Sequence, residues 1–216
     1  MKSKMQIVLL KLPVKYKYTK ISLTRYTMIN SKDSYKHFLS EDKKALNIVE
    51  TNKISISLNP YNIDLEIWRF QIQLRKCEYL YNLNKKNILW KLKKFFAARL
   101  FKKLSCKLGF TIDPNCFGEG LRIAHRGTIV VNGRARIGTN CTINACVNIG
   151  ATPGFDDAVP TIGNNVYIGP GAKIYGKIYI ADGCIIGANA VVNKDCLETN
   201  MLLIGIPAIA RKPKSN

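Results

Sequence analysis

The sequence predicts a mainly β fold, a parallel β-helix preceded by an α-helical region. Its main signal is a six-residue period between Leu121 and Val192. Neither a helix face nor a single strand places an aliphatic residue only at every sixth position, whereas short strands joined by regular turns do. Such hexapeptide repeats are typical of a solenoid whose turns bury their faces against one another. The unbroken series is Ile162, Ile168, Ile174, Ile180, Ile186 and Val192.

A second column of residues supports the repeat. The interval of six also links Ile137, Ile143 and Ile149, and separately Ile123 and Ile129. Small or compact apolar residues stand four positions after the aliphatic ones, and we expect both columns to line the interior. The second column consists of Gly127, Cys141, Val147, Val166, Ala172, Ile178, Cys184 and Ala190.

The period breaks between Ile149 and Ile162, which lie thirteen positions apart. The run Pro153-Gly154-Phe155-Asp156-Asp157 predicts a loop within residues 151–161. A loop extruded from a regular solenoid is functional more often than a loop elsewhere.

The chain divides into three parts. Residues 1–27 are basic, contain Pro13 and lack periodicity, so we expect a flexible extension. One hypothesis is that Met28 is the true or an alternative start, and an ordinary flexible N-terminus is the simpler interpretation. Residues 28–109 form the α-helical region, and residues 110–216 form the β-helix with its C-terminal tail. Apolar spacing predicts helices over Ser34–Val49, Asn62–Tyr81 and Lys85–Lys107, and an extended segment at Ile54–Leu58.

The third predicted helix, Lys85–Lys107, is amphipathic and strongly basic. It contains no acidic residue, and its apolar stripe consists of Leu89, Leu92, Phe96, Leu100 and Leu104. Such a helix packs its stripe on a neighbour or lies on an anionic membrane. Both interpretations stay open, and the second predicts peripheral association with the inner face of the membrane.

The composition is strongly basic, with 34 Lys and Arg against 14 Asp and Glu and a formal net charge of +20. Nucleic acid, an anionic membrane and an anionic substrate are the usual partners of such a chain, and solvated lysine-rich faces are the simpler interpretation. No DNA- or RNA-binding signature is present, so we expect no nucleic-acid partner. The seven cysteines lack paired spacings, which predicts no metal site, and Cys141, Cys184 and Cys196 suit compact core residues in a reducing cytoplasm.

Three segments resemble a known family. Ile162-Gly-Asn-Asn-Val-Tyr-Ile-Gly-Pro-Gly-Ala-Lys-Ile174 and Gly205-Ile-Pro-Ala208 resemble the hexapeptide-repeat acyltransferases. Ile123-Ala-His-Arg-Gly-Thr-Ile-Val-Val131 resembles their serine acetyltransferase branch, which includes relatives that O-acetylate cell-surface saccharides. The resemblance covers roughly residues 110–211. It implies a left-handed β-helix of triangular cross-section, three hexapeptides per turn, and a homotrimer. An exposed apolar flank that includes Val131, Ile178 and Val191 also favours a trimer.

The resemblance implies that His125 is the catalytic base. Neutral imidazole titrates near neutral pH and would take the proton of an acceptor hydroxyl as it attacks the thioester of acetyl-CoA. The backbone N–H of Ala151 or Thr152 would stabilise the tetrahedral oxyanion. Either Asp113 or Glu119 would orient His125, and the sequence leaves this choice open.

The resemblance also indicates where acetyl-CoA binds, as a co-substrate along the later repeats. Pro170 and Ala188 match groove positions, and Gly171 and Gly187 would allow close backbone approach of the pantetheine arm. Arg211 and Lys212 would contact the nucleotide phosphates.

The acceptor is where this chain departs from serine acetyltransferases. Ala124 replaces the Asp that precedes their catalytic His, and Ala158-Val159 replaces an Arg-His pair that helps hold the serine carboxylate. We therefore expect a saccharide acceptor from surface-polysaccharide synthesis. Two alternative functions remain, a serine acetyltransferase of cysteine synthesis and a non-catalytic β-helix scaffold. In the first, Arg126 or Arg134 would bind the serine carboxylate from another direction. The residues expected to contact the saccharide are Asn132, Asn148, Phe155, Asp156 and Asp157.

Overall fold

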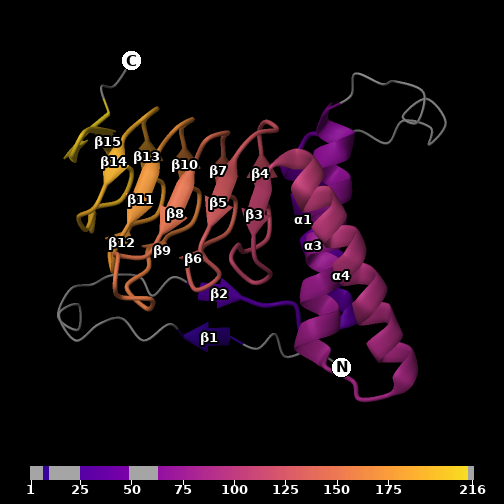
Figure 1. Ribbon diagram of the computed structural model, residues 1–216. Helices are drawn as coiled ribbons and strands as arrows, with labels where there is room; N and C mark the ends of the chain where they lie inside the picture. The colour runs from indigo at the N-terminus through magenta and orange to yellow at the C-terminus, as the bar shows by residue number, and fades with distance from the viewer. Residues whose placement is uncertain (1–6, 10–24, 49–62, 214–216) are drawn as a thin grey trace.

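The computed structural model describes residues 7–9, 25–48 and 63–213. In these ranges, three helices stand at one end of a β-helix, and the chain ends at the other (Figure 1). The expected strand at Ile54–Leu58 and most of residues 1–27 lie outside the described residues. The short strands β1 (Ile7–Leu9) and β2 (Arg25–Thr27) pair antiparallel.

The β-helix has three walls, each a sheet of short strands from successive turns of the chain. The five-stranded wall contains β3 (Phe110–Ile112), β5 (Ile129–Val131), β8 (Asn148–Gly150), β11 (Lys173–Tyr175) and β14 (Val191–Val192). The six-stranded wall contains β4 (Arg122–Ile123), β7 (Thr142–Ile143), β10 (Tyr167–Ile168), β13 (Ile185–Ile186), β15 (Leu202–Gly205) and β16 (Ala208–Arg211). The three-stranded wall contains β6 (Arg136–Ile137), β9 (Thr161–Ile162) and β12 (Tyr179–Ile180). Neighbours within each wall are parallel, except that β16 pairs antiparallel with β15.

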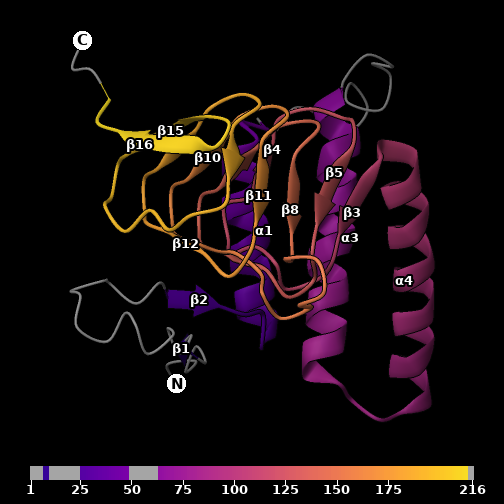
Figure 2. The same cartoon turned by 60° about the vertical axis from the view of Figure 1, so that its left-hand side comes forward.

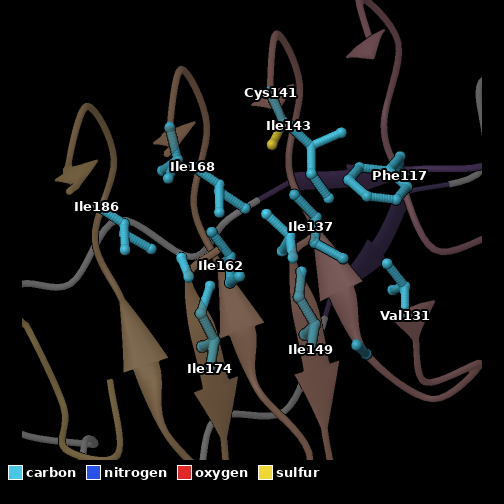
Figure 3. Packing of buried hydrophobic residues seen from close by; sticks show 14 of the residues in the cluster. Phe117, Val131, Ile137, Cys141, Ile143, Ile149, Ile162, Ile168, Ile174 and Ile186 are labelled. Carbon is cyan, nitrogen blue, oxygen red and sulfur yellow. The ribbon is translucent and has the colours of Figure 1, made fainter. Parts of the chain in front are cut away.

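The two predicted columns fill the interior. Ile143 pairs with Ile168 and Ile168 with Ile186, and all three side chains are fully buried. Figure 3 shows these isoleucines and those of the other walls pointing inward. The small residues of the second column, from Cys141 to Ala190, are buried as well. Each rung therefore covers its neighbour, as a solenoid requires.

Two sequence-based details of the β-helix were wrong. Ile129 is out of register with the main column, because Val131 is the residue that pairs with Ile149. Val131 and Ile178 are buried within the chain, at 2% and 8% exposure, so they do not form an exposed flank. The exposed apolar side chains of the six-stranded wall include Tyr167 and Ile185.

The helices begin and end where capping residues stand. Helix α1 (Lys32–Ala45) starts at the N-cap Ser31, and Ser34 completes a capping box with it. Helix α4 (Ile88–Leu108) starts at the N-cap Asn87 and ends at Gly109, whose left-handed conformation is the usual helix stop. Between them, α3 (Ile63–Leu83) buries four of the five residues predicted from its spacing, which are Ile67, Phe70, Leu74 and Cys77, whereas the fifth, Tyr81, is 49% exposed.

Helix α4 does not bury its predicted stripe. Its inward side chains are Trp90, Ala97 and Leu108, and Trp90 donates its indole N–H to the Leu80 carbonyl at 2.9 Å. The expectation that the stripe packs on a neighbour was wrong for its first four members. These exposed residues are Leu89, Leu92, Phe96 and Leu100.

A buried guanidinium joins the helices to the β-helix. Arg75 of α3 is fully buried and contacts Asp42 of α1 through Nε at 2.8 Å and Nη2 at 3.1 Å. Its Nη1 also contacts Glu78 at 3.0 Å and donates to the Phe117 carbonyl at 2.9 Å. Its Nη2 donates to the Gly118 carbonyl at 2.6 Å. All five N–H donors of the guanidinium therefore have acceptors.

The two carboxylates of this cluster also serve the first turn of the β-helix. Asp42 accepts the Leu121 N–H at 2.9 Å, and Glu78 accepts the Asn115 N–H at 2.8 Å. Burial raises the pKa of Glu78, although the nearby Arg75 opposes that shift. Burial alone would lower the pKa of Arg75, but the two carboxylates outweigh it and raise that pKa. The guanidinium is therefore charged at neutral pH.

Removal of the guanidinium should be strongly destabilising. We expect Arg75→Met to lower the free energy of unfolding by about 3–5 kcal/mol, because buried Asp42 and Glu78 lose their cation. Urea unfolding followed by circular dichroism measures this loss. The matched control is Lys44→Met, which breaks the exposed Lys44–Glu41 pair and should cost at most about 1 kcal/mol. An Arg75→Met loss no larger than that of the control would contradict this role.

Candidate active site

The predicted site residues lie mainly along two edges of the β-helix, where one wall meets the next. The His125 edge joins the six-stranded wall to the five-stranded wall and carries His125, Ala145, Pro170 and Ala188 in successive rungs. The loop edge joins the five-stranded wall to the three-stranded wall and carries Asn132 and residues 151–160. The five-stranded wall therefore separates the two sets within one chain.

His125 lies on a turn that is longer than the turn in the next rung. Ile123 pairs with Ile143, and Val131 pairs with Ile149. Val131 follows Ile123 by eight positions, whereas Ile149 follows Ile143 by only six. The two additional residues project His125 from the edge, and its side chain is exposed. Regular packing therefore leaves this imidazole free to meet a substrate.

The residue after His125 is tied to the helices. Arg126 contacts Glu66 of α3 at 3.1 Å, and Glu66 also contacts Lys107 of α4 at 2.6 Å. The hydrogen bond from Lys107 is the main cause that lowers the pKa of Glu66, so its carboxylate is ionised at neutral pH. This exposed network links the turn that carries His125 to two helices.

Four predicted acetyl-CoA contacts follow His125 along the same edge. Pro170 and Ala188 are exposed, and Gly171 and Gly187 are partly exposed beside them. Neighbouring strands lie about 4.8 Å apart, so three rungs separate His125 from Ala188 by roughly 14 Å. Gly171 has a φ of +74°, and a Cβ there would lie 2.0 Å from Oδ1 of Asn189. The turn itself therefore requires this glycine.

The predicted tail contacts lie beyond the last rung. Arg211 ends β16 and is exposed, and its backbone pairs with Leu202 of β15. Lys212 is exposed, with its Nζ 4.0 Å from a Glu198 carboxylate oxygen. Both cations are accessible to an anionic ligand at the end of the β-helix.

The loop edge carries the predicted oxyanion donors. The Thr152 N–H already donates to the Ala158 carbonyl at 3.0 Å, and the Phe155 N–H donates to the Thr152 carbonyl at 3.0 Å. Thr152 would have to break that bond to bind an oxyanion, which favours Ala151 of the two candidates. Phe155, Asp156 and Asp157 are exposed at the tip of this loop.

An open groove of about 450 Å³ lies on the loop edge, beside the first rungs. Asn132 and Asn148, both predicted acceptor contacts, line it together with Asp113 and Arg134. Sequence reasoning considered these two charged residues separately and missed that they share one groove. The pairing of β3 with β5 brings them together, since each residue follows the end of its strand.

A second cavity of about 420 Å³ lies further along the loop edge. Thr152, Lys177, Asn193 and Lys194 are among its lining residues. Sequence reasoning missed the two lysines, although each stands shortly after a buried column residue, where a turn residue points outward. Asp195 also lines it, so two cations stand against one acid, and this excess of positive charge makes the cavity a candidate site for an anionic part of a ligand.

The acid that would orient His125 does not lie beside it in the same chain. Asp113 is on the loop edge, and Glu119 lies between Phe117 and β4, where it accepts a hydrogen bond from Thr27 Oγ1 at 2.5 Å. Among the described residues, no three His, Cys, Asp or Glu side chains gather as a metal site would require.

The chain is similar to known proteins in both sequence and structure. Residues 160–194 match the family model "Bacterial transferase hexapeptide (six repeats)". A serine acetyltransferase of Helicobacter pylori is 38% identical over 117 residues, which are 53% of this chain and 68% of that protein. A serine acetyltransferase of Staphylococcus xylosus is 37% identical over 123 residues, 55% of this chain and 56% of that protein.

Solved serine acetyltransferases share the fold. The Brucella abortus enzyme in complex with coenzyme A has a TM-score of 0.62 and 25% identity, covering 85% of this chain and 70% of that one. The Neisseria gonorrhoeae enzyme in complex with serine has a TM-score of 0.59 and 26% identity, covering 84% and 70%. These likenesses confirm the left-handed β-helix with a helical N-terminal region.

Proposed function

Because the chain belongs to the serine acetyltransferase-like branch of the hexapeptide-repeat acyltransferases and is an acetyl-CoA-dependent O-acetyltransferase, we propose that it acetylates the hydroxyl of L-serine. The sequence by itself favoured a saccharide acceptor. The relatives named above support L-serine better than a saccharide, since they carry the name serine acetyltransferase. They also favour an enzyme over a non-catalytic scaffold.

The groove on the loop edge is the observation that carries this proposal. Arg134 and Asp113 line it with opposite charges, and Asn132 and Asn148 line it with neutral amides. A zwitterionic amino acid needs a cation for its carboxylate and an anion for its ammonium group, and burial without both is costly. Arg134 supplies the first and Asp113 the second, which offsets the absence of charge at Ala158 and Val159.

A trimer would bring the two edges together. In a ring of three chains with the five-stranded walls facing the axis, the His125 edge of one chain meets the loop edge of the next. His125 and the groove with Asp113 and Arg134 then face each other across the interface. The acid that orients His125 is in this arrangement Asp113 of the neighbouring chain.

The chemistry is direct transfer by general-base catalysis. Neutral His125 takes the hydroxyl proton as the serine oxygen forms a bond to the thioester carbonyl carbon. The backbone N–H of Ala151 of the neighbouring chain, on the loop edge, donates to the resulting oxyanion. The tetrahedral intermediate then collapses, the carbon–sulfur bond breaks, and the His125 imidazolium returns the proton to the departing thiolate. No covalent enzyme intermediate is required.

A saccharide hydroxyl remains the second candidate acceptor. Phe155 is 63% exposed at the loop tip, where its ring offers a stacking face, and Asp156 and Asp157 beside it are exposed. Aromatic and carboxylate side chains at such a tip suit the apolar face and the hydroxyls of a sugar. Turnover of acetyl-CoA with L-serine against nucleotide sugars and oligosaccharides separates the two acceptors.

Substitution of Arg134 tests the serine proposal. We expect Arg134→Gln to raise KM for L-serine roughly 10- to 100-fold with little change in kcat, because a charge-assisted contact present throughout the reaction is lost. Steady-state kinetics with free-thiol detection measure both constants. Arg122→Gln, an exposed change on the six-stranded wall, is the control and should leave KM unchanged. Turnover with a saccharide but not with L-serine would instead support the second candidate.

Substitution of His125 tests the base. We expect His125→Ala to lower kcat by roughly 10²- to 10⁴-fold, the usual contribution of a positioned base, and to leave the fold intact because the side chain is exposed. The same kinetic assay and circular dichroism measure the two effects. His37→Ala on α1 removes the other, also exposed, histidine and should leave kcat unchanged. Activity of the His125 variant within about threefold of the parent places the base elsewhere.

The shared site requires an oligomer. We expect light scattering to give a mass about three times the 24.3 kDa of one chain. At an L-serine concentration well below the KM of Arg134→Gln, mixing His125→Ala with Arg134→Gln chains should restore part of the activity, since some interfaces then combine two unaltered edges. A monomer with full activity would refute the two-edge site.

A further inference from the structure

Helices α3 and α4 stand at the β3 end of the five-stranded wall (Figure 2). None of the described helices is long and apolar enough to cross a bilayer. The end of α4 makes two backbone hydrogen bonds to the turn that carries His125. The Gly127 N–H donates to the carbonyl of Leu108, the last residue of α4, at 3.2 Å, and the Ile129 N–H donates to the Gly109 carbonyl at 3.1 Å. The last carbonyls of a helix lack partners within it, so the turn caps α4 while α4 fixes the backbone of the turn.

Two glycines allow this close contact between the helix end and the turn. A Cβ at Gly109 would lie 3.2 Å from the carbonyl carbon and oxygen of Gly127. A Cβ at Gly127 would lie 3.2 Å from the Cβ of Ala145, in the next rung. The backbone two residues after His125 is therefore packed between α4 on one side and the next rung on the other.

A network of side chains spans the same junction. Glu66 of α3 accepts from Arg126 Nη1 with one carboxylate oxygen, at 3.1 Å, and from Lys107 Nζ with the other, at 2.6 Å. The side chain of Glu66 is 28% exposed, whereas those of Arg126 and Lys107 are 48% and 58% exposed. One acid thus joins the residue after His125 to the last turn of α4, and its removal breaks both contacts.

The placement of the imidazole limits the rate of general-base catalysis. The base must lie within hydrogen-bond distance of the hydroxyl that it deprotonates. A displacement of about 1 Å can cost up to roughly 100-fold in rate, even when its cause lies far from the reacting atoms. His125 is exposed on a turn that is two residues longer than its counterpart in the next rung, so the rungs alone do not fix it.

We propose that Glu66 and Arg126 are positioning residues, which hold the turn of His125 in the orientation that proton transfer requires. They act through the backbone beside the base and touch no reacting atom. The proposal rests on the proposed function in one respect, that His125 is the base, and it holds for either acceptor. It also assigns different tasks to two arginines, since Arg126 binds Glu66 whereas Arg134 is the cation in the acceptor groove.

Steady-state kinetics with acetyl-CoA and L-serine test the proposal. We expect Glu66→Ala and Arg126→Ala each to lower kcat roughly 5- to 20-fold and to keep KM for both substrates within about threefold, because proton transfer and not substrate binding is impaired. The double variant should be no slower than Glu66→Ala, since that change already removes the shared contact. Arg126→Lys should recover at least about half of the parent kcat, because only Nη1 of Arg126 contacts Glu66.

A matched control and a structural measurement separate positioning from stability. Glu41→Ala breaks the exposed Lys44–Glu41 pair on α1 and should leave kcat unchanged. The unfolding temperature should stay within about 3 °C of the parent in every variant, since exposed ion pairs contribute little to stability. Amide hydrogen exchange over residues 125–129 should become roughly three- to fivefold faster in Glu66→Ala but not in Glu41→Ala.

The outcomes distinguish this inference from the proposed function. An unchanged kcat in Glu66→Ala, together with an inactive His125→Ala variant, would overturn the inference and leave the proposed base in place. Full activity of His125→Ala would refute the base and the inference together. A KM for L-serine that rises in Arg126→Ala but not in Glu66→Ala would show that Arg126 binds the carboxylate, which also overturns the positioning role. If the parent acetylates a saccharide and not L-serine, the same kcat ratios are expected with that saccharide.

Discussion

The Arg75 guanidinium and its two buried carboxylates close the open end of the β-helix. A solenoid leaves the backbone groups of its first turn without a neighbouring rung, and such ends must be capped. Here the carbonyls of Phe117 and Gly118 accept from Arg75 directly. The Leu121 carbonyl accepts from Gln71 Nε2 at 2.8 Å, and the Asp42 carboxylate accepts the Leu121 N–H. The helices are therefore a polar cap as well as an apolar one. At the far end, β16 folds back on β15 and covers that last strand.

This cap also holds the turn that carries His125. His125 lies in the turn after β4, in the rung next to the helices, and Glu66 of α3 contacts Arg126 of that turn. The additional length of the turn is tolerated there because the interior register is kept by Ile123 and Val131. A rigid stack of rungs thus supports one projecting histidine. The later turns of the same edge stay short, as the pairing of Ile143 with Ile168 and of Ile168 with Ile186 shows.

Separate faces of the molecule carry separate tasks. The interior columns stabilise the β-helix, and the polar groups of the candidate site lie along its edges. Helix α4 buries Trp90 on its inner side and exposes Phe96 on its outer side. Two of the fourteen acids, Asp42 and Glu78, are buried around Arg75 and do not offset cations at the surface. The excess of cations is consequently concentrated on exposed surfaces.

The repeat was readable from the sequence because it is local: each isoleucine meets an equivalent residue a fixed number of positions away, as Ile168 meets Ile186. His125 was found through a contiguous motif, and helix ends at Ser31 and Gly109 follow from capping residues beside them. Arg75 gave no such signal, because a charged residue on a helix looks solvated until Asp42, 33 positions away, folds against it. The sequence did not reveal that Ile129 is out of register with the main column, because Ile129 lies six positions after Ile123 although the turn between their strands is longer.

Asp113 and Arg134 come together only through strand pairing. Helix α4 exposes its apolar stripe because its opposite side packs on α3. These contacts depend on residues distant in sequence, so tertiary structure alone decided them.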